Sequence, residues 1–198
     1  MKLINFLHAS VAALGLLSPV AARAHSRSHR FVIRRNVVAN QTTGNALIPV
    51  VVGGPQDLFV PNLVRANVGD VVQFQFSNGN HTVTQSTETD GCQPMQASEP
   101  NAIHSGHIPF KAGQVNVGTF NMVVTSTEPM FLYCATGPHC QTGQVMVINP
   151  TNDVQLANYA KVSQSTTASV DGKHVAGGIV GTIPLEKAAF VPAPPEEE

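Results

Sequence analysis

The sequence predicts an all-β fold, a Greek-key β-sandwich, and three observations favour it. The chain of 198 residues contains 16 Gly and 14 Pro but only 12% charged residues, which is untypical of a helical bundle. Short apolar runs, rich in β-branched residues, recur between residues 47 and 149. Turn signals separate these runs at the spacing of a small sandwich. We therefore expect about seven to eight strands, followed by a short C-terminal helix and a disordered tail.

Strands are expected wherever β-branched or alternating apolar residues run between two turn signals. Pro61 assigns its own segment to a sheet edge, because proline cannot donate a hydrogen bond to a neighbouring strand. The tight turn over residues 77–80 predicts that His81 begins a strand. The expected strands are residues 47–52, 59–68, 71–76, 81–85, 115–124, 130–134 and 144–149.

Three segments lack a strand pattern. Residues 86–113 show neither helix nor strand periodicity, and a stretch of this length is usually functional or disordered. A disulfide at Cys92 would make it an ordered excursion. Residues 151–162 are expected to form an amphipathic helix with Thr151 or Asn152 as N-cap. Residues 163–198 are rich in Ser, Thr, Gly and Ala and end in Pro-Ala-Pro-Pro-Glu-Glu-Glu, so we expect a disordered tail. This tail has no hydrophobic end, and a lipid anchor is therefore not expected.

The N-terminus is typical of a secretory signal. Lys2 supplies a basic start, residues 11–17 form a short apolar run, and Ala22-Arg23-Ala24 offers a cleavage pattern. The run is too short to span a bilayer. We predict a signal peptide over residues 1–24 and a secreted protein, extracellular or in the cell wall.

An N-terminal extension is expected over residues 25–44. Arg34-Arg35 offers a second processing site, at 35/36, so the mature chain begins at His25 or at Asn36. Asn40 opens the glycosylation sequon Asn-Gln-Thr. The domain itself is expected over residues 45–162. The net charge of −1 gives no electrostatic reason to expect nucleic acid or an anionic membrane as partner.

Secretion decides how the three cysteines are interpreted. In an oxidising compartment two cysteines should form a disulfide, and the third should have another role, such as binding a metal. We predict a disulfide between Cys92 and Cys140, which leaves Cys134 for a metal. Cross-linking a loop of this length would stabilise the fold by roughly 4 kcal/mol in the chain-entropy model.

Residues 131–144 carry the strongest chemical signal in the chain. Cys134, His139 and Gln144 follow one another at intervals of five and offer a thiolate, an imidazole and an amide oxygen. Two imidazoles, one thiolate and a weak axial donor suit copper that works as both Cu(I) and Cu(II). His81 is the best second imidazole, because a strand that follows a tight turn can fix its position.

These residues resemble a known family. Asn80-His81-Thr82-Val83-Thr84, Tyr133-Cys134 and the pattern Cys-x4-His-Cys-x2-Gly-Gln over residues 134–144 resemble the cupredoxins. The similarity is greatest to stellacyanin-type phytocyanins and to secreted cupredoxin-like proteins of fungi, whose Val-Ile-Asn-Pro-Thr continuation also occurs at residues 147–151. The resemblance covers roughly residues 45–160.

The resemblance implies a cupredoxin-like sandwich with one type 1 (blue) copper per chain and a disulfide next to it. It implies that an unknown redox partner docks near His139, where Gly137 and Pro138 leave room. Gln144 replaces the common Met, and a harder oxygen donor should lower the reduction potential. We expect a monomer. The implied copper ligands are His81, Cys134, His139 and Gln144, and the implied disulfide joins Cys92 and Cys140.

The function expected first is one-electron transfer by a secreted blue copper protein. The alternative is an extracellular copper-binding or matrix module without redox turnover. We do not expect an enzyme, because the His-x-His pairs and His-Cys-His cluster of multicopper oxidases do not occur. No second copper pattern accompanies an N-terminal His25. The pair His104 and His107 lacks a third donor, and we interpret it as part of a polar loop near the copper face.

Overall fold

The computed structural model describes residues 45–192. The predicted signal peptide, the extension, both processing sites and Asn40 lie outside the described residues. No helix within the described range has the length and hydrophobicity that a membrane span requires. In chain order the elements are β1 (Leu47–Gly53), β2 (Leu58–Val60), β3 (Leu63–Val64), β4 (Val71–Phe76), β5 (Gly79–His81), β6 (Thr84–Ser86), η1 (Met95–Ala97), β7 (Ile108–Phe110), β8 (Asn116–Val123), β9 (Met130–Tyr133), β10 (Val145–Ile148), α1 (Val154–Gln164), β11 (Ile179–Pro184) and η2 (Leu185–Lys187).

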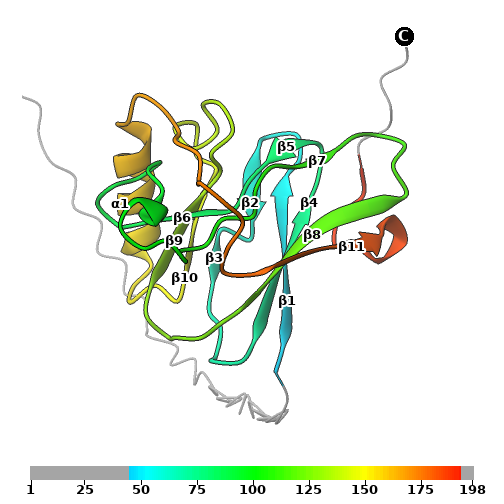
Figure 1. Ribbon diagram of the computed structural model, residues 1–198, viewed down its shortest axis with the longest axis horizontal. Coiled ribbons are helices and arrows are strands. Elements are labelled where there is room, and N and C mark those ends of the chain that lie inside the picture. The colour runs from blue at the N-terminus through cyan, green and yellow to red at the C-terminus, as the bar shows by residue number, and fades with distance from the viewer. Residues whose placement is uncertain (1–44, 193–198) are drawn as a thin grey trace, which may run out of the picture. The chain divides into compact units, whose positions relative to one another are not determined.

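The larger sheet of the described domain has the strand order β11-β8-β4-β1-β2 (Figure 1). β4 pairs with β8 in antiparallel fashion and with β1 in parallel, with Val50 opposite Phe74. The predicted alternation of β4 is realised, because Val72, Phe74 and Phe76 are fully buried. Pro61 follows β2, and the chain passes there to β3 in the second sheet, so β2 is an edge strand as expected.

A four-stranded sheet of order β3-β10-β9-β6 forms the second layer of residues 45–192, and a short pair of β5 and β7 closes one end. The core between the two layers combines Phe74 and Phe120 of the first sheet with Leu132, Met146 and Ile148 of the second. The predicted all-β sandwich is therefore confirmed. The strand number of eleven in the described residues exceeds the predicted seven to eight, because several strands have only two or three residues.

The predicted helix is present as α1, a few residues later than the range 151–162. Asn152 acts as its capping side chain, because its Oδ1 accepts hydrogen bonds from the backbone N–H groups of Val154 and Gln155 at 3.0 and 3.2 Å. The helix lies beside β9 and β10, away from the larger sheet (Figure 1). Its buried Tyr159 packs against Phe131, with ring centroids 5.1 Å apart.

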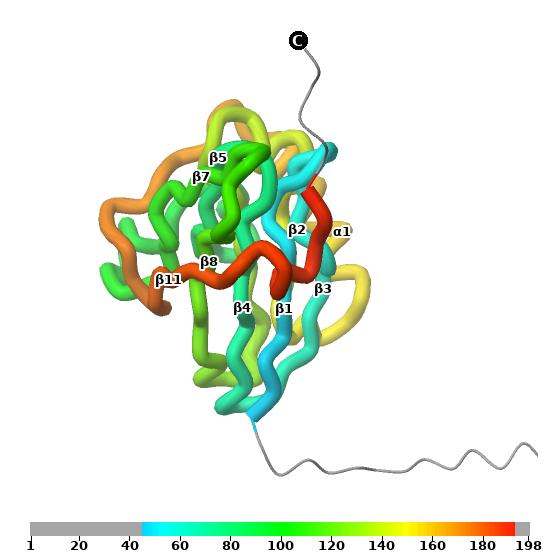
Figure 2. Tube along the Cα trace, turned by 90° about the vertical axis from the view of Figure 1, so that its right-hand side faces the viewer, coloured from blue at the N-terminus to red at the C-terminus, as the bar shows by residue number. Residues whose placement is uncertain are grey.

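Two segments without a predicted strand are ordered in the structure, the first as a disulfide at Cys92 implies and the second against the expectation of a disordered tail. The stretch 86–113 contains η1 and β7, and the buried side chain of Gln96 bonds to the backbone of Ala102 and His174. From residue 163 to residue 192 the chain follows a defined path (orange to red in Figure 2), and β11 extends the larger sheet by pairing with β8. Hydrogen bonds to the sheet and the loops order this segment, although its composition predicts disorder.

Candidate metal centre

His81 ends β5, and does not begin a strand as the turn signal predicted. Its imidazole is fully buried, and its Nε2 lies 2.8 Å from the backbone carbonyl oxygen of Asn78. Two glycines make room for the ring. A Cβ on Gly53 would lie 2.5 Å from Nε2 of His81, and a Cβ on Gly79 would lie 2.6 Å from it. The hydrogen bond to Asn78 leaves Nδ1 of His81 to face Cys134 and Gln144, the first and last residues of the metal loop (residues 134–144).

Cys134 follows β9 directly and is the free cysteine of the chain. Its sulfur is buried and accepts a hydrogen bond of 3.4 Å from the backbone N–H of Thr82. The hydroxyl of Thr82 accepts a second bond of 2.7 Å, from the backbone N–H of Ala135. Thr82, the residue after His81, is therefore bonded both to the Cys134 sulfur and to the backbone of Ala135. These two bonds fix the distance between His81 and Cys134.

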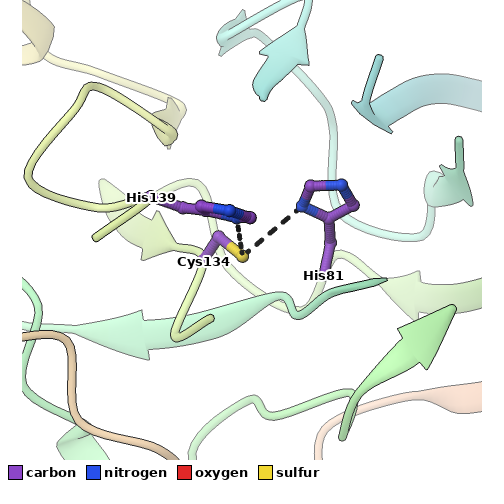
Figure 3. A group of neighbouring side chains, drawn as sticks. All are labelled: His81, Cys134 and His139. Carbon is purple, nitrogen blue, oxygen red and sulfur yellow. Dashed lines mark hydrogen bonds between the residues drawn. The ribbon is translucent and has the colours of Figure 1, made fainter. Parts of the chain in front are cut away.

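The sulfur of Cys134 lies between two imidazoles (Figure 3). It is 3.6 Å from Nδ1 of His139 and 3.8 Å from Nδ1 of His81. Among residues 45–192, these three side chains are the group of histidine, cysteine and acidic residues whose donor atoms all lie within 4.8 Å of one another. The structure thus brings together three of the four ligands that the sequence predicts.

Gln144, the residue directly before β10, completes the predicted set of ligands. Its side chain is fully buried, and its Oε1 lies 3.1 Å from Nδ1 of His81. The amide nitrogen donates to the backbone carbonyl of Leu58 at 3.4 Å. This bond orients the amide, so that its oxygen faces the group of donors.

The loop between Cys134 and Gln144 is held by its own backbone and by a disulfide. The N–H of Gln144 donates to the carbonyl of His139 at 2.8 Å, and the N–H of His139 donates to the carbonyl of Thr136 at 3.1 Å. Cys140 is joined to Cys92, with their Cα atoms 5.8 Å apart. This is the predicted pairing, and it fixes the residue next to His139.

The thiol and the two imidazoles change one another's protonation. Burial by itself raises the pKa of the Cys134 thiol, but hydrogen bonds from His139, His81 and the backbone lower it to about 6. The bond to Cys134 raises the pKa of His139. Burial lowers the pKa of His81, but its bonds to Cys134 and Asn78 outweigh burial and leave it raised. The metal-free site therefore favours a thiolate, the form that binds metals.

Asp57 is a neighbour of the site that sequence reasoning missed. It lies in the turn between β1 and β2, and its carboxylate oxygens are 3.6 Å from Nε2 of His81 and 3.6 Å from Nε2 of His139. The Gly53-Gly54-Pro55 break signals this turn but not its purpose. The roles of Asn78 and Thr82 were also missed, although Thr82 belongs to the motif that contains His81, and Asn78 lies two residues before this motif.

His104 and His107 lie next to the site but outside it. The carboxylate of Asp171 bridges them, at 3.5 Å from Nε2 of His104 and 2.8 Å from Nε2 of His107. Nδ1 of His107 lies 3.2 Å from the side chains of both Asn80, which precedes His81, and Thr136, which is two residues after Cys134. The pair thus fastens the C-terminal segment to the metal loop.

No family model matches the chain, but curated relatives do. It is 33% identical over 93 residues to the "Probable GPI-anchored cupredoxin-1" of Arthroderma benhamiae, which covers 46% of this chain and 44% of that protein. It is 32% identical over 135 residues to the "Extracellular serine-rich protein" of the same organism, covering 68% of this chain and 51% of that protein. The chain thus spans about half the length of these curated relatives. The first relative confirms the resemblance to cupredoxins.

Solved structures of cupredoxins are also similar to the chain. The purple cupredoxin of Nitrosopumilus maritimus has a TM-score of 0.38 and 15% identity, covering 52% of this chain and 97% of that one. A mutant plastocyanin of fern has a TM-score of 0.36 and 18% identity, covering 50% and 96%.

Proposed function

We propose that this cupredoxin-like protein is a secreted one-electron carrier that binds one copper ion through His81, Cys134, His139 and Gln144. The observation that carries the proposal is the convergence of the four donors. Both Nδ1 atoms lie within 4 Å of the Cys134 sulfur, and the Gln144 oxygen faces the same place.

The donor set fits copper better than other common metals. A soft thiolate and two imidazoles with a weak fourth donor are typical of blue copper sites, whereas structural zinc sites use four strong ligands. When bound, copper would supply a Cu(II)/Cu(I) couple. The low pKa of Cys134 supports metal binding in general, because the thiolate is available at neutral pH.

The surroundings of the donors favour electron transfer over catalysis. Cys134, His81 and Gln144 are fully buried, and His139 is the member with an exposed edge, at 19% of its side chain. A catalytic metal site keeps an open position for substrate. Here His81 ends β5, Cys134 directly follows β9, and Gln144 directly precedes β10, so strands hold three of the four donors in place. A rigid donor set limits the reorganisation that accompanies electron transfer.

The extracellular location is also a proposal. The disulfide of Cys92 and Cys140 is stable in oxidising compartments. The names of both curated relatives, one GPI-anchored and one extracellular, support the same location. The redox partner is expected to approach the exposed edge of His139.

The decisive experiment is to load the purified protein with Cu(II). We expect an intense thiolate-to-copper absorption band on the order of 600 nm, as is typical of a His2Cys site. The Cys134→Ser variant should lack this band, and the His174→Ala variant, which changes an exposed histidine, should keep it. A colourless copper complex would contradict the blue-copper assignment. A blue protein that cannot be reduced and reoxidised reversibly would favour the copper-binding module without turnover.

A further inference from the structure

Asp57 occupies an unusual place relative to the candidate ligands. The donor atoms of His81 and His139 that face Cys134 are their Nδ1 atoms. The carboxylate of Asp57 lies on the opposite edges of the same two rings, 3.6 Å from each Nε2. A single negative charge is thus shared by both imidazoles, on the side away from the donor group.

The backbone holds Asp57 at this place. Its φ of +48° is in the left-handed region, which Asp and Asn tolerate better than most residues. Its N–H donates to the carbonyl of Gly54 at 3.2 Å, which closes the turn between β1 and β2. In the described part of the chain, its carboxylate has no lysine or arginine within ion-pair distance. Its charge is therefore not neutralised by a cationic side chain there.

The two imidazoles depend on Asp57 to different extents. Nε2 of His81 already has the carbonyl of Asn78 at 2.8 Å, so Asp57 is its second partner. Nε2 of His139 has no hydrogen-bond acceptor among residues 45–192, and Asp57 is its ion-pair partner. At 3.6 Å the contact is longer than a hydrogen bond, so the carboxylate acts mainly through its charge.

We propose that Asp57 is a positioning residue that makes the site prefer Cu(II) over Cu(I). This inference rests on the proposed function. A carboxylate on the outer nitrogen of a ligating imidazole makes the ring a stronger donor. A nearby negative charge also stabilises a doubly charged ion more than a singly charged one. Both effects favour the oxidised state, and both act through the histidines without contact between Asp57 and the metal.

The test compares Asp57→Asn with Asp153→Asn. Asn keeps the shape of Asp57 and tolerates its backbone conformation, so the first variant should fold and lose only the charge. Asp153 carries the same charge but lies away from the donors, past the other end of β10: Gln144 directly precedes this strand, whereas Asp153 follows it. Asp153 pairs there with Arg65. The dissociation constants for Cu(II) and for Cu(I) are measured separately, by competition with chelators, on the full protein and both variants.

We expect Asp57→Asn to weaken Cu(II) binding about tenfold and to leave Cu(I) binding almost unchanged. For a one-electron couple, a tenfold change in Cu(II) affinity relative to Cu(I) affinity raises the reduction potential by about 59 mV. Asp153→Asn should leave both constants unchanged. Equal weakening of both ions by Asp57→Asn would indicate a merely structural role and overturn the proposal, as would no change in either.

The outcomes for Asp57 and for the proposed function are distinguishable. If the parent protein binds copper without the thiolate band, the blue-copper assignment is overturned. The ratio of the Cu(II) and Cu(I) dissociation constants still decides the role of Asp57. If the parent protein is blue but Asp57→Asn leaves the ratio of the Cu(II) and Cu(I) dissociation constants unchanged, only the role of Asp57 is overturned. A parent that binds neither ion overturns both.

Discussion

Gly53 lies against the imidazole of His81 so closely that a Cβ at this position would be 2.5 Å from Nε2. The φ of Gly53 is also positive, at +103°. A candidate ligand is thus held in place by a residue without a side chain, at the end of β1. The position of His81 depends on the absence of atoms at Gly53 as much as on its hydrogen bond to Asn78.

The Gly53→Ala variant should therefore bind copper more weakly. Its methyl group would displace the ring of His81, and we expect copper affinity to fall at least about tenfold. Gly54→Ala is the matched control, because Gly54 also has a positive φ, +87°, but no atom lies within 4 Å of its added Cβ. Both variants should lose about 1–2 kcal/mol of unfolding free energy from backbone strain. Equal copper affinity in the two variants, measured by competition titration, would contradict the contact with His81.

The role of Gln144 is tested by its replacement with methionine. A thioether is a softer donor than an amide oxygen and favours Cu(I), so Gln144→Met should raise the reduction potential. We expect a rise of at least about 59 mV, a tenfold shift between oxidation states. Gln141→Met changes a glutamine of the same loop whose amide bonds to Thr166 and Ser169, and should leave the potential unchanged. Redox titration of the blue band measures both, and an unchanged potential in Gln144→Met would rule out an axial role.

The fold was predictable where local sequence and burial agree. The alternation of apolar and polar residues over 71–76 correctly predicted β4, because one face of that strand packs against the core through Phe74. β11 was missed because its residues are exposed or half-buried, and the strand forms only through pairing with β8. A partner strand that lies more than fifty residues away, as Asn121 does from Ile179, leaves no mark on local periodicity.

The candidate site was predictable where its donors are close in sequence. Cys134, His139 and Gln144 belong to one loop, so their spacing alone indicates a common ion. His81 required the additional observation of a tight turn. Asp57 could not be predicted, because only the packing of the turn between β1 and β2 against the metal loop brings it to the imidazoles.

Removal of the disulfide should lower stability without removing the metal site. The double change Cys92→Ala and Cys140→Ala opens a cross-link between residues 48 positions apart. The chain-entropy model gives a loss of about 4 kcal/mol for such a loop. The blue band should persist, because neither sulfur belongs to the donor group. Denaturant unfolding of the metal-free protein measures the loss, and disappearance of the band in the folded variant would assign one of the two sulfurs to the metal.

The protonation of Cys134 in the metal-free protein gives the last prediction. Burial opposes ionisation of the thiol, but the bonds from His139, His81 and the backbone lower its pKa from the ordinary 9.0 to about 6. Between these values the unfolded chain binds more protons at this group than the folded chain does. The contribution of Cys134 to stability is therefore complete above pH 9.0 and is lost as pH falls through about 6.

The two imidazoles contribute with the opposite sign. Their folded-state pKa values are raised above 6.5, so their contribution is complete below that pH and is lost as pH rises through the folded pKa values. Overall stability therefore mixes two opposed trends, and the thiolate must be measured directly. Its ultraviolet absorbance should rise with a midpoint near pH 6 in the folded metal-free protein and near 9.0 in denaturant. Cys134→Ser should show no such step, whereas a folded-state midpoint near 9.0 would mean that the histidines do not stabilise the thiolate.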